Sequence, residues 1–363
     1  MEFQRVYIES LGFTLPQTVV SSDQLENQLQ PLYERLKLPE GRLELMTGIK
    51  ERRFWPLNTS IADISVSSCR QALQAAGMNA DRIGLLIHGS VCRDHLEPAT
   101  ACRVHCELGL PKQCMIYDVS NACLGILNGM LQAANMIELG HIEAALVVGS
   151  ENGCGLVSAT VDALNNDLSL TRKSIKQSIA SLTIGSASCA VLMTGKSLSK
   201  SNSRLLHGVV TANTQHHKLC QSLSDQAGGN MQPLMDTDSE TMMLQGVETG
   251  RITYERLLEI SGWKRPDINH TFCHQVGSTH RKLMLESIQM PTETDYSTFP
   301  FLGNTGSAAL PITFAHAITE QRLSQDEKLA LLGIGSGINS VMMTVDWQNA
   351  TVQGCEKDSF GND

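Results

Sequence analysis

The stretch Tyr117–Met130, with the sequence YDVSNACLGILNGM, places a cysteine where a strand gives way to a helix. Apolar residues run up to this turn as in a buried strand, and from Leu124 onward they recur at helical spacing. At the start of a helix, unpaired N–H groups and the helix dipole favour a thiolate, so Cys123 is a candidate nucleophile. Its small neighbours Ala122 and Gly125 leave room for a substrate carbonyl, and its N–H can donate to an oxyanion. A buried core cysteine is the competing explanation.

Length and composition indicate an ordinary soluble protein. The chain has 363 residues, of which 42% are hydrophobic and 18% are charged, so it can bury a large core and is expected to divide into two domains or two halves. The net charge of −9 and the lack of a dense Lys/Arg run argue against a nucleic-acid partner. No apolar run reaches the length of about 18 residues that a membrane span needs. Small ligands or proteins are therefore the expected partners.

The eleven cysteines do not form a metal or disulfide pattern. No Cys-x2-Cys pair is present, and the odd total leaves one cysteine unpaired. The chain starts Met-Glu-Phe-Gln-Arg, without the apolar segment of a secretion signal. We therefore expect reduced cysteines, no metal and a cytoplasmic location.

An internal match indicates two similar halves. The segment Ile184–Thr194 recurs as Ile334–Thr344, displaced by 150 residues (334 − 184), with six of eleven positions identical. Each copy is a Gly/Ser bend that enters a β-rich run, as expected for two copies of one α/β unit; chance similarity of two buried strands is the alternative. We place the halves at 1–200 and 201–347. We expect the polar segment 215–241 to form a loop over a site, and the tail 348–363 to be disordered.

Three further signals lie in the second half. His274 follows an apolar strand, Asn304 lies in a glycine-flanked turn, and Ser336 lies in a Gly-Ser-Gly bend. Taken singly, they fit a core histidine, a turn-capping asparagine and tight packing. Together with Cys123 they supply what acyl transfer through a thioester requires. These requirements are a nucleophile, two donors for a thioester oxygen, and backbone N–H groups for the acyl-enzyme oxyanion.

A charged segment beside aromatic residues is a weaker candidate for substrate binding. Arg52 and Arg53 stand directly before Phe54 and Trp55, and such a run can meet the phosphates of a ligand. A solvated charged turn is the more common explanation. We therefore treat the two arginines only as weak substrate-binding candidates.

Four motifs, in this order and spacing, resemble the thiolase-fold condensing enzymes of the ketoacyl synthase III type. They are Asp118–Cys123, His274-Gln275, Gly303–Thr305 and Gly335–Gly337, and the agreement extends over nearly the whole chain. The resemblance implies a five-layered αβαβα fold of two similar halves, a homodimer, and a Cys-His-Asn site at the bottom of a coenzyme A tunnel. It also implies coenzyme A thioesters as substrates, with acyl carrier protein as an alternative carrier, and no separate cofactor.

Two departures distinguish the chain from the biosynthetic ketoacyl synthases III. Met46 stands where those enzymes usually have an arginine that helps to hold coenzyme A, and Gly185–Ser188 replaces their Gly-Asp-Gly-Ala. The chain more closely resembles the acyl-CoA condensing enzymes of the bacterial long-chain olefin pathway (OleA type). Those enzymes show a Ser-Val-x-Arg-Asp-x-Leu-Glu-Pro segment, present here as Ser90–Pro98, and a Gly-Ile-Gly-Ser-Gly segment, present as Gly333–Gly337.

Glu97 distinguishes between two reactions. It precedes Cys123 by 26 residues (123 − 97). A malonyl extender generates its carbanion by losing CO2, whereas two plain acyl thioesters need a base that removes an α-proton. Taken alone, Glu97 would be an exposed loop carboxylate. The resemblance implies that it is this base and that it enters the active site from the partner subunit.

The sequence therefore predicts an acyltransferase of lipid biosynthesis that joins two fatty acyl-CoA molecules in a non-decarboxylative Claisen condensation. Cys123 would carry the first acyl group, Glu97 would deprotonate the second, and His274 with Asn304 would hold a thioester oxygen. The N–H groups of Cys123 and Ser336 would form the oxyanion hole. The alternatives are a decarboxylating 3-oxoacyl synthase III that uses a malonyl thioester, and a non-catalytic supporting subunit. The complete Cys-His-Asn set argues against the latter.

Overall fold

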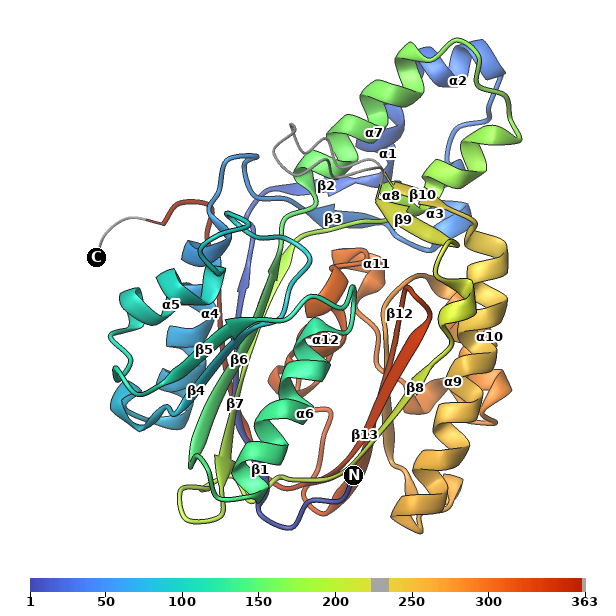
Figure 1. Ribbon diagram of the computed structural model, residues 1–363. Helices are drawn as coiled ribbons and strands as arrows, with labels where there is room; N and C mark the ends of the chain where they lie inside the picture. Colours follow the sequence, from blue (N-terminus) through green and yellow to red (C-terminus); the bar gives the residue numbers. More distant parts are fainter. Residues whose placement is uncertain (223–234, 361–363) are drawn as a thin grey trace.

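The centre of the protein is a ten-stranded mixed sheet (Figure 1). The computed structural model describes residues 1–222 and 235–360. Along the sheet the strands are β11 (His270–Cys273), β12 (Glu327–Gly335), β13 (Asn339–Trp347), β8 (Arg204–Ala212), β1 (Val6–Leu15), β7 (Ala187–Gly195), β6 (Ala144–Glu151), β4 (Leu85–His88) and β5 (Met115–Asp118), and β14 (Thr351–Glu356) pairs with β1.

Two half-sheets join between β1 and β8, where Tyr7 is paired with Arg204. Helices α6 (Gly125–Glu138) and α12 (Ala309–Thr319) lie between the half-sheets (Figure 1). The outer faces are covered by α4 (Ile61–Ala76) and α5 (Thr100–Leu108) on one side and by α9 (Ser239–Ser261) and α10 (Ser278–Ser287) on the other. The order helix, sheet, helix, sheet, helix confirms the predicted five-layered αβαβα fold.

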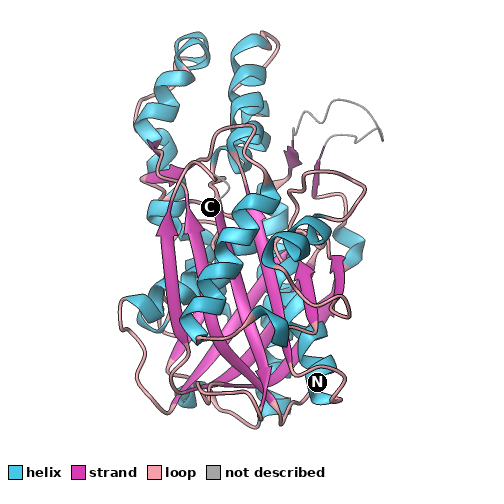
Figure 2. Ribbon diagram, turned by 90° about the vertical axis from the view of Figure 1, so that its left-hand side faces the viewer, coloured by secondary structure: helices cyan, strands magenta, loops and turns pink. Residues whose placement is uncertain are grey.

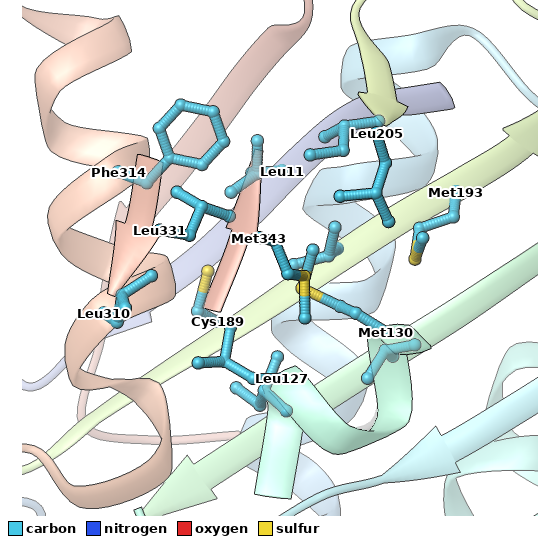
Figure 3. Close-up of a cluster of buried hydrophobic side chains, with 14 of the residues drawn as sticks. Leu11, Leu127, Met130, Cys189, Met193, Leu205, Leu310, Phe314, Leu331 and Met343 are labelled. Atoms are coloured by element: carbon cyan, nitrogen blue, oxygen red, sulfur yellow. The ribbon is translucent and has the colours of Figure 1, made fainter. Parts of the chain in front are cut away.

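The internal repeat corresponds to equivalent strands of the two half-sheets. β7 runs antiparallel to β6, and β13 runs antiparallel to β12. We propose that the halves divide near residue 200, between the end of β7 and the start of β8. The main core lies where they meet: Figure 3 shows side chains of β1, α6, β7, α12, β12 and β13 packed together, among them Leu11, Leu127 and Phe314. Such burial contributes about 1.5–3 kcal/mol per large apolar side chain.

The prediction of a disordered tail over 348–363 is wrong for residues 351–356. Residues 351–356 form β14, which lies parallel to β1 from Ser10↔Thr351 to Leu15↔Glu356. The strand was hidden because most of its side chains are polar or exposed, while its stability comes from the backbone ladder. Gly354 packs on the Phe13 ring, where a Cβ would overlap the aromatic carbons. Residues 361–363 lie outside the described part of the chain.

A group of short elements extends beyond the end of the sheet (Figures 1 and 2). Its elements are β2 (Val19–Ser21), α1 (Ser22–Gln28), α2 (Gln30–Leu36), α3 (Arg42–Thr47), β3 (Glu51–Arg53), α7 (Cys154–Asn166), α8 (Ile179–Leu182), β9 (Cys220–Ser222), β10 (Met235–Thr237) and α11 (Phe299–Leu302). In the predicted loop 215–241, β9 pairs with β10, and residues 223–234 lie outside the described residues. No helix in the described ranges is long and apolar enough to cross a membrane.

Candidate active site

Four of the predicted site residues line one cavity. Cys123, His274, Asn304 and Ser336 come from separate loops of the two halves and meet in a cavity of about 1770 Å³. Ordinary small-molecule sites have volumes of about 300–1,000 Å³, so this cavity has room for a long ligand. Its walls include apolar side chains, among them Leu156, Ile179, Met235, Met242 and Ile334.

Cys123 lies in the turn between β5 and α6. Ala122 has a φ of +46°, and the Leu124 N–H donates to the Asn121 carbonyl at 3.0 Å, so the chain turns sharply before α6 begins at Gly125. Gly125 is small for a reason other than substrate access. A Cβ there would overlap the backbone carbonyl of Gly89, which crosses the start of the helix. The turn therefore holds the cysteine against the end of β4.

The expected thiolate is not the resting form of this cysteine. Burial in the cavity wall, followed by the charges of Glu151 and Cys220, raises the pKa of Cys123 to about 12. Desolvation penalises the charged sulfur and therefore favours the thiol. Cys123 is therefore a thiol at neutral pH, and its proton must leave as the sulfur attacks.

The turn containing Ser336 is fastened to the turn containing Cys123. The Asn339 Nδ2 group donates to Asn121 Oδ1 at 3.2 Å and to the Ser336 carbonyl at 3.4 Å. A Cβ on Gly335 would lie 3.7 Å from the Cys123 nitrogen, so the two backbones approach closely. The geometry can hold two backbone N–H groups near one thioester oxygen.

His274 extends the pairing of β11 with β12, because its N–H donates to the Leu332 carbonyl at 3.1 Å. Gln275 fixes the following turn by accepting from the N–H groups of Thr298 at 3.1 Å and Phe299 at 3.3 Å. Burial, followed by the neighbouring His280, lowers the pKa of His274 to about 3. The ring is neutral at physiological pH and can donate one N–H.

Asn304 is held by backbone hydrogen bonds to the first half. Its N–H donates to the Thr183 carbonyl at 2.9 Å, and its carbonyl accepts from the Gly185 N–H at 2.9 Å. Its Oδ1 accepts from the Gly306 N–H at 3.1 Å. The amide oxygen is thus engaged, and the Nδ2 group, which has no partner among the described residues, is available to donate to a ligand in the cavity.

Glu97 lies on the loop between β4 and α5, is exposed, and is outside the cavity lining of its own chain in the described residues. The loop is anchored at several points. Asp94 accepts from the Ile61 N–H at 2.6 Å, and Asp118 accepts from the Thr100 N–H at 2.8 Å, which places each carboxylate at a helix N-terminus. The loop that carries Glu97 is therefore held at Asp94 and at the start of α5.

The positions of Arg52 and Arg53 do not support the substrate-binding role considered for them. Arg52 is fully buried and donates to Ser22 Oγ at 3.0 Å and to the Leu182 carbonyl. Arg53 donates to the Pro16 carbonyl at 2.8 Å and pairs with Glu356 at 3.0 Å. Neither arginine is among the described residues that line the cavity. The sequence shows that the two arginines are charged, but it does not show that carbonyl oxygens from other parts of the chain accept their hydrogen bonds.

Sequence reasoning missed several titratable groups in the cavity, among them Glu151, Cys220 and His280. Burial lowers the pKa of His280 to about 4, so this ring is also neutral. Glu151 ends the apolar strand β6, just as His274 follows the apolar strand β11. The sequence signal that could have identified Glu151 is a polar residue at the end of an apolar strand. Among the described residues, no group of His, Cys, Asp and Glu is arranged to hold a metal ion.

The fold and this site define a thiolase-fold condensing enzyme, and the comparisons with known proteins agree. Residues 45–215 match the model for the thiolase N-terminal domain, and residues 258–347 match that for the C-terminal part of 3-oxoacyl-[acyl-carrier-protein] synthase III. The chain is 40% identical over 351 residues to the acyl-CoA:acyl-CoA alkyltransferase of Shewanella oneidensis, covering 96% of this chain and all of that protein. It is 33% identical over 347 residues to the Xanthomonas campestris protein of that name, with 96% and 100% coverage. The chain belongs to the acyl-CoA:acyl-CoA alkyltransferase family and is an acyltransferase.

Solved structures of Xanthomonas campestris OleA give the same result. A variant with its cysteine replaced by alanine has a TM-score of 0.90 and 32% identity, covering 96% of this chain and 98% of the other. A cysteine-to-serine variant, described with bound lauric acid and lauroyl-CoA, has a TM-score of 0.89 and 32% identity, with 95% and 100% coverage. Other variants alter a glutamate. That glutamate precedes the altered cysteine by 26 residues, which is the spacing of Glu97 and Cys123.

Proposed function

We propose that this enzyme joins two fatty acyl-CoA molecules head to head and forms a 2-alkyl-3-ketoacyl product through an acyl group on Cys123. The observation that carries the proposal is that Cys123, His274, Asn304 and Ser336 line one cavity of about 1770 Å³, in a chain 40% identical to an acyl-CoA:acyl-CoA alkyltransferase. Coenzyme A, rather than acyl carrier protein, carries both acyl groups in this proposal. We also propose a cytoplasmic location, with which the eleven free cysteines are compatible.

In the first step, the Cys123 sulfur attacks the carbonyl carbon of an acyl-CoA. The N–H groups of Cys123 and Ser336 stabilise the tetrahedral oxyanion. The C–S bond to coenzyme A then breaks, and the proton of the Cys123 thiol ends on the departing coenzyme A sulfur. Because the raised pKa keeps this proton on the resting thiol, thiol deprotonation and attack are coupled.

In the second step, Glu97 of one subunit removes an α-proton from an acyl-CoA bound in the cavity of its partner. Neutral His274 and Asn304 donate to the thioester oxygen, which gains negative charge as the enolate forms. The enolate carbon attacks the acyl group on Cys123 and the bond to Cys123 breaks. The free thiol forms again when the sulfur takes up a proton.

A homodimer is part of this proposal, because the exposed Glu97 requires a partner cavity. β5 lies at an edge of the sheet, beyond which the described residues place no further strand. Met115 of this strand is 50% exposed, and Val91 and Leu96 on the Glu97 loop, which also line the cavity, are 52% and 60% exposed. An unpaired strand edge beside exposed apolar residues favours pairing with a second copy.

Wild-type enzyme supplied with a single saturated acyl-CoA and no malonyl thioester is expected to release coenzyme A and form the 2-alkyl-3-keto product. The product is measured by mass spectrometry as the ketone that remains after its decarboxylation. A reaction that also contains malonyl-CoA is the matched comparison. Product that appears only when malonyl-CoA is present would establish the decarboxylating reaction instead.

Replacing His274 or Asn304 by alanine is expected to slow condensation more than acylation of Cys123. Both side chains donate to the enolate oxygen, whereas backbone N–H groups stabilise the acyl-enzyme oxyanion. The loss of one such donor typically costs on the order of 100-fold. Intact mass measures the acyl adduct, and ketone formation measures condensation. Near-wild-type condensation in both variants would assign these residues to packing alone.

A further inference from the structure

Glu151 is a buried carboxylate in the wall of the cavity that holds Cys123. It ends β6 and is only 5% exposed. A buried carboxylate is costly unless hydrogen bonds compensate for its lost hydration. The groups that donate hydrogen bonds to Glu151 therefore indicate its role. The two proposed acyl-transfer steps do not use this carboxylate.

Hydrogen bonds join Glu151 to two loops of the active site. Its Oε1 accepts from the Val91 N–H at 3.0 Å, and its Oε2 accepts from the Cys92 N–H at 3.0 Å. Oε1 also accepts from the Ser307 hydroxyl at 2.6 Å and from the Ser307 N–H at 3.3 Å. Val91 and Cys92 begin the loop that leads to Glu97, and Ser307 follows Asn304 by three residues.

The backbone of the Asn304 turn also packs closely against the Glu151 side chain. Gly306 has a φ of +58°, and a Cβ there would lie 3.0 Å from the Glu151 Cγ. The residue before Glu151 contributes as well, because the Ser150 N–H donates to Ser90 Oγ at 2.7 Å. The end of β6 is therefore where the Asn304 turn and the Glu97 loop are attached to one another.

We propose that Glu151 is a positioning residue that holds the Glu97 loop and the Asn304 turn in register, so that condensation depends on it more than acylation does. The distinction between the two steps rests on the proposed function, whereas the attachment of the two segments does not. The carboxylate matters because all its partners here are donors. An amide at this position presents an NH2 group to one of these N–H groups, and two donors cannot pair.

The charge of Glu151 has a second consequence, which its substitution can reveal. Glu151 is one of the groups that raise the pKa of Cys123, after burial and together with Cys220 of β9; His274 and His280 in the same cavity are neutral. Removing the carboxylate charge lowers the pKa of Cys123. The thiolate fraction at a given pH then rises, and alkylation of this residue becomes faster.

The test compares Glu151→Gln with Glu9→Gln and the wild type as full-length proteins. Glu9 is a matched control because it is also buried, at 3% exposure, and accepts from the Lys200 N–H at 2.9 Å, but does not line the cavity. The measurements are the acyl adduct on Cys123, ketone formation, and hydrogen exchange of the segments 90–98 and 303–307. Alkylation of Cys123 by iodoacetamide is followed across pH by peptide mapping.

For Glu151→Gln we expect acylation within about 3-fold of wild type and condensation reduced by about 10-fold or more, since a small misplacement of catalytic groups costs rates of this order. Hydrogen exchange is expected to accelerate in both segments, and Cys123 alkylation to shift to lower pH. None of these changes is expected in Glu9→Gln. Equal losses of acylation and condensation, unchanged condensation, or unchanged exchange would overturn the proposal. If the wild type forms no two-acyl product, the proposed function fails. The hydrogen-exchange rates of the two segments and the pH dependence of Cys123 alkylation then still test whether Glu151 holds the segments together.

Discussion

Replacing Cys123 by alanine is expected to abolish both the covalent acyl adduct and the condensation product. Wild-type enzyme incubated with a medium- or long-chain acyl-CoA should gain the mass of one acyl group per chain, and Cys123→Ala should gain none. Asn339 fastens the turn that carries this sulfur to the Ser336 bend, whose N–H group is part of the proposed oxyanion hole. Loss of a covalent nucleophile lowers turnover on the order of 10⁴-fold or more.

Cys106→Ala is the matched control for this experiment, because Cys106 is an exposed cysteine on α5 outside the cavity lining. This control should acquire the adduct as the wild type does. An adduct that persists in Cys123→Ala, on Cys92 or Cys273 for example, would transfer the nucleophilic role to another residue and remove the basis of the proposed mechanism.

The local signals for the candidate site were readable from the sequence because each lies where a strand or turn ends. Cys123, His274 and Asn304 each follow or interrupt an apolar run and stand near glycines, and the structure brings all three to one cavity. Glu151 ends a strand as well, but its role depends on Val91, 60 residues away, and on Ser307, 156 residues away. A single sequence does not show such contacts, since they form only when the two halves pack.

The incorrect expectations have physical causes of the same kind. The position of Cys123 before a helix suggested a thiolate, but burial, followed by the charges of Glu151 and Cys220, raises its pKa to about 12. Arg52 belongs to a charged run, yet it is fully buried against Ser22 and the Leu182 carbonyl. In both cases the surroundings, which come from distant parts of the chain, decide the behaviour of a local feature.

Replacing Glu97 by glutamine is expected to leave Cys123 acylation intact and to lower condensation of two acyl-CoA molecules by roughly 100-fold or more, the scale of general-base contributions. Glutamine keeps the shape of the side chain but cannot take an α-proton. Because Glu97 is exposed and outside its own cavity, the effect should arise in the partner subunit. Condensation at the wild-type rate in Glu97→Gln would refute the base assignment.

Mixing two inactive variants tests whether the base acts across the dimer. In a mixed dimer of Cys123→Ala and Glu97→Gln subunits, one cavity combines an intact Cys123 with an intact Glu97 from the partner. After unfolding and co-refolding of equal amounts, we expect about a quarter of wild-type activity, because about half of the dimers are mixed and each has one complete site. A mixture of wild-type subunits with subunits carrying both substitutions controls for recovery on refolding. If Glu97 acts within its own chain, the mixture of single variants stays inactive, because no subunit then holds both groups.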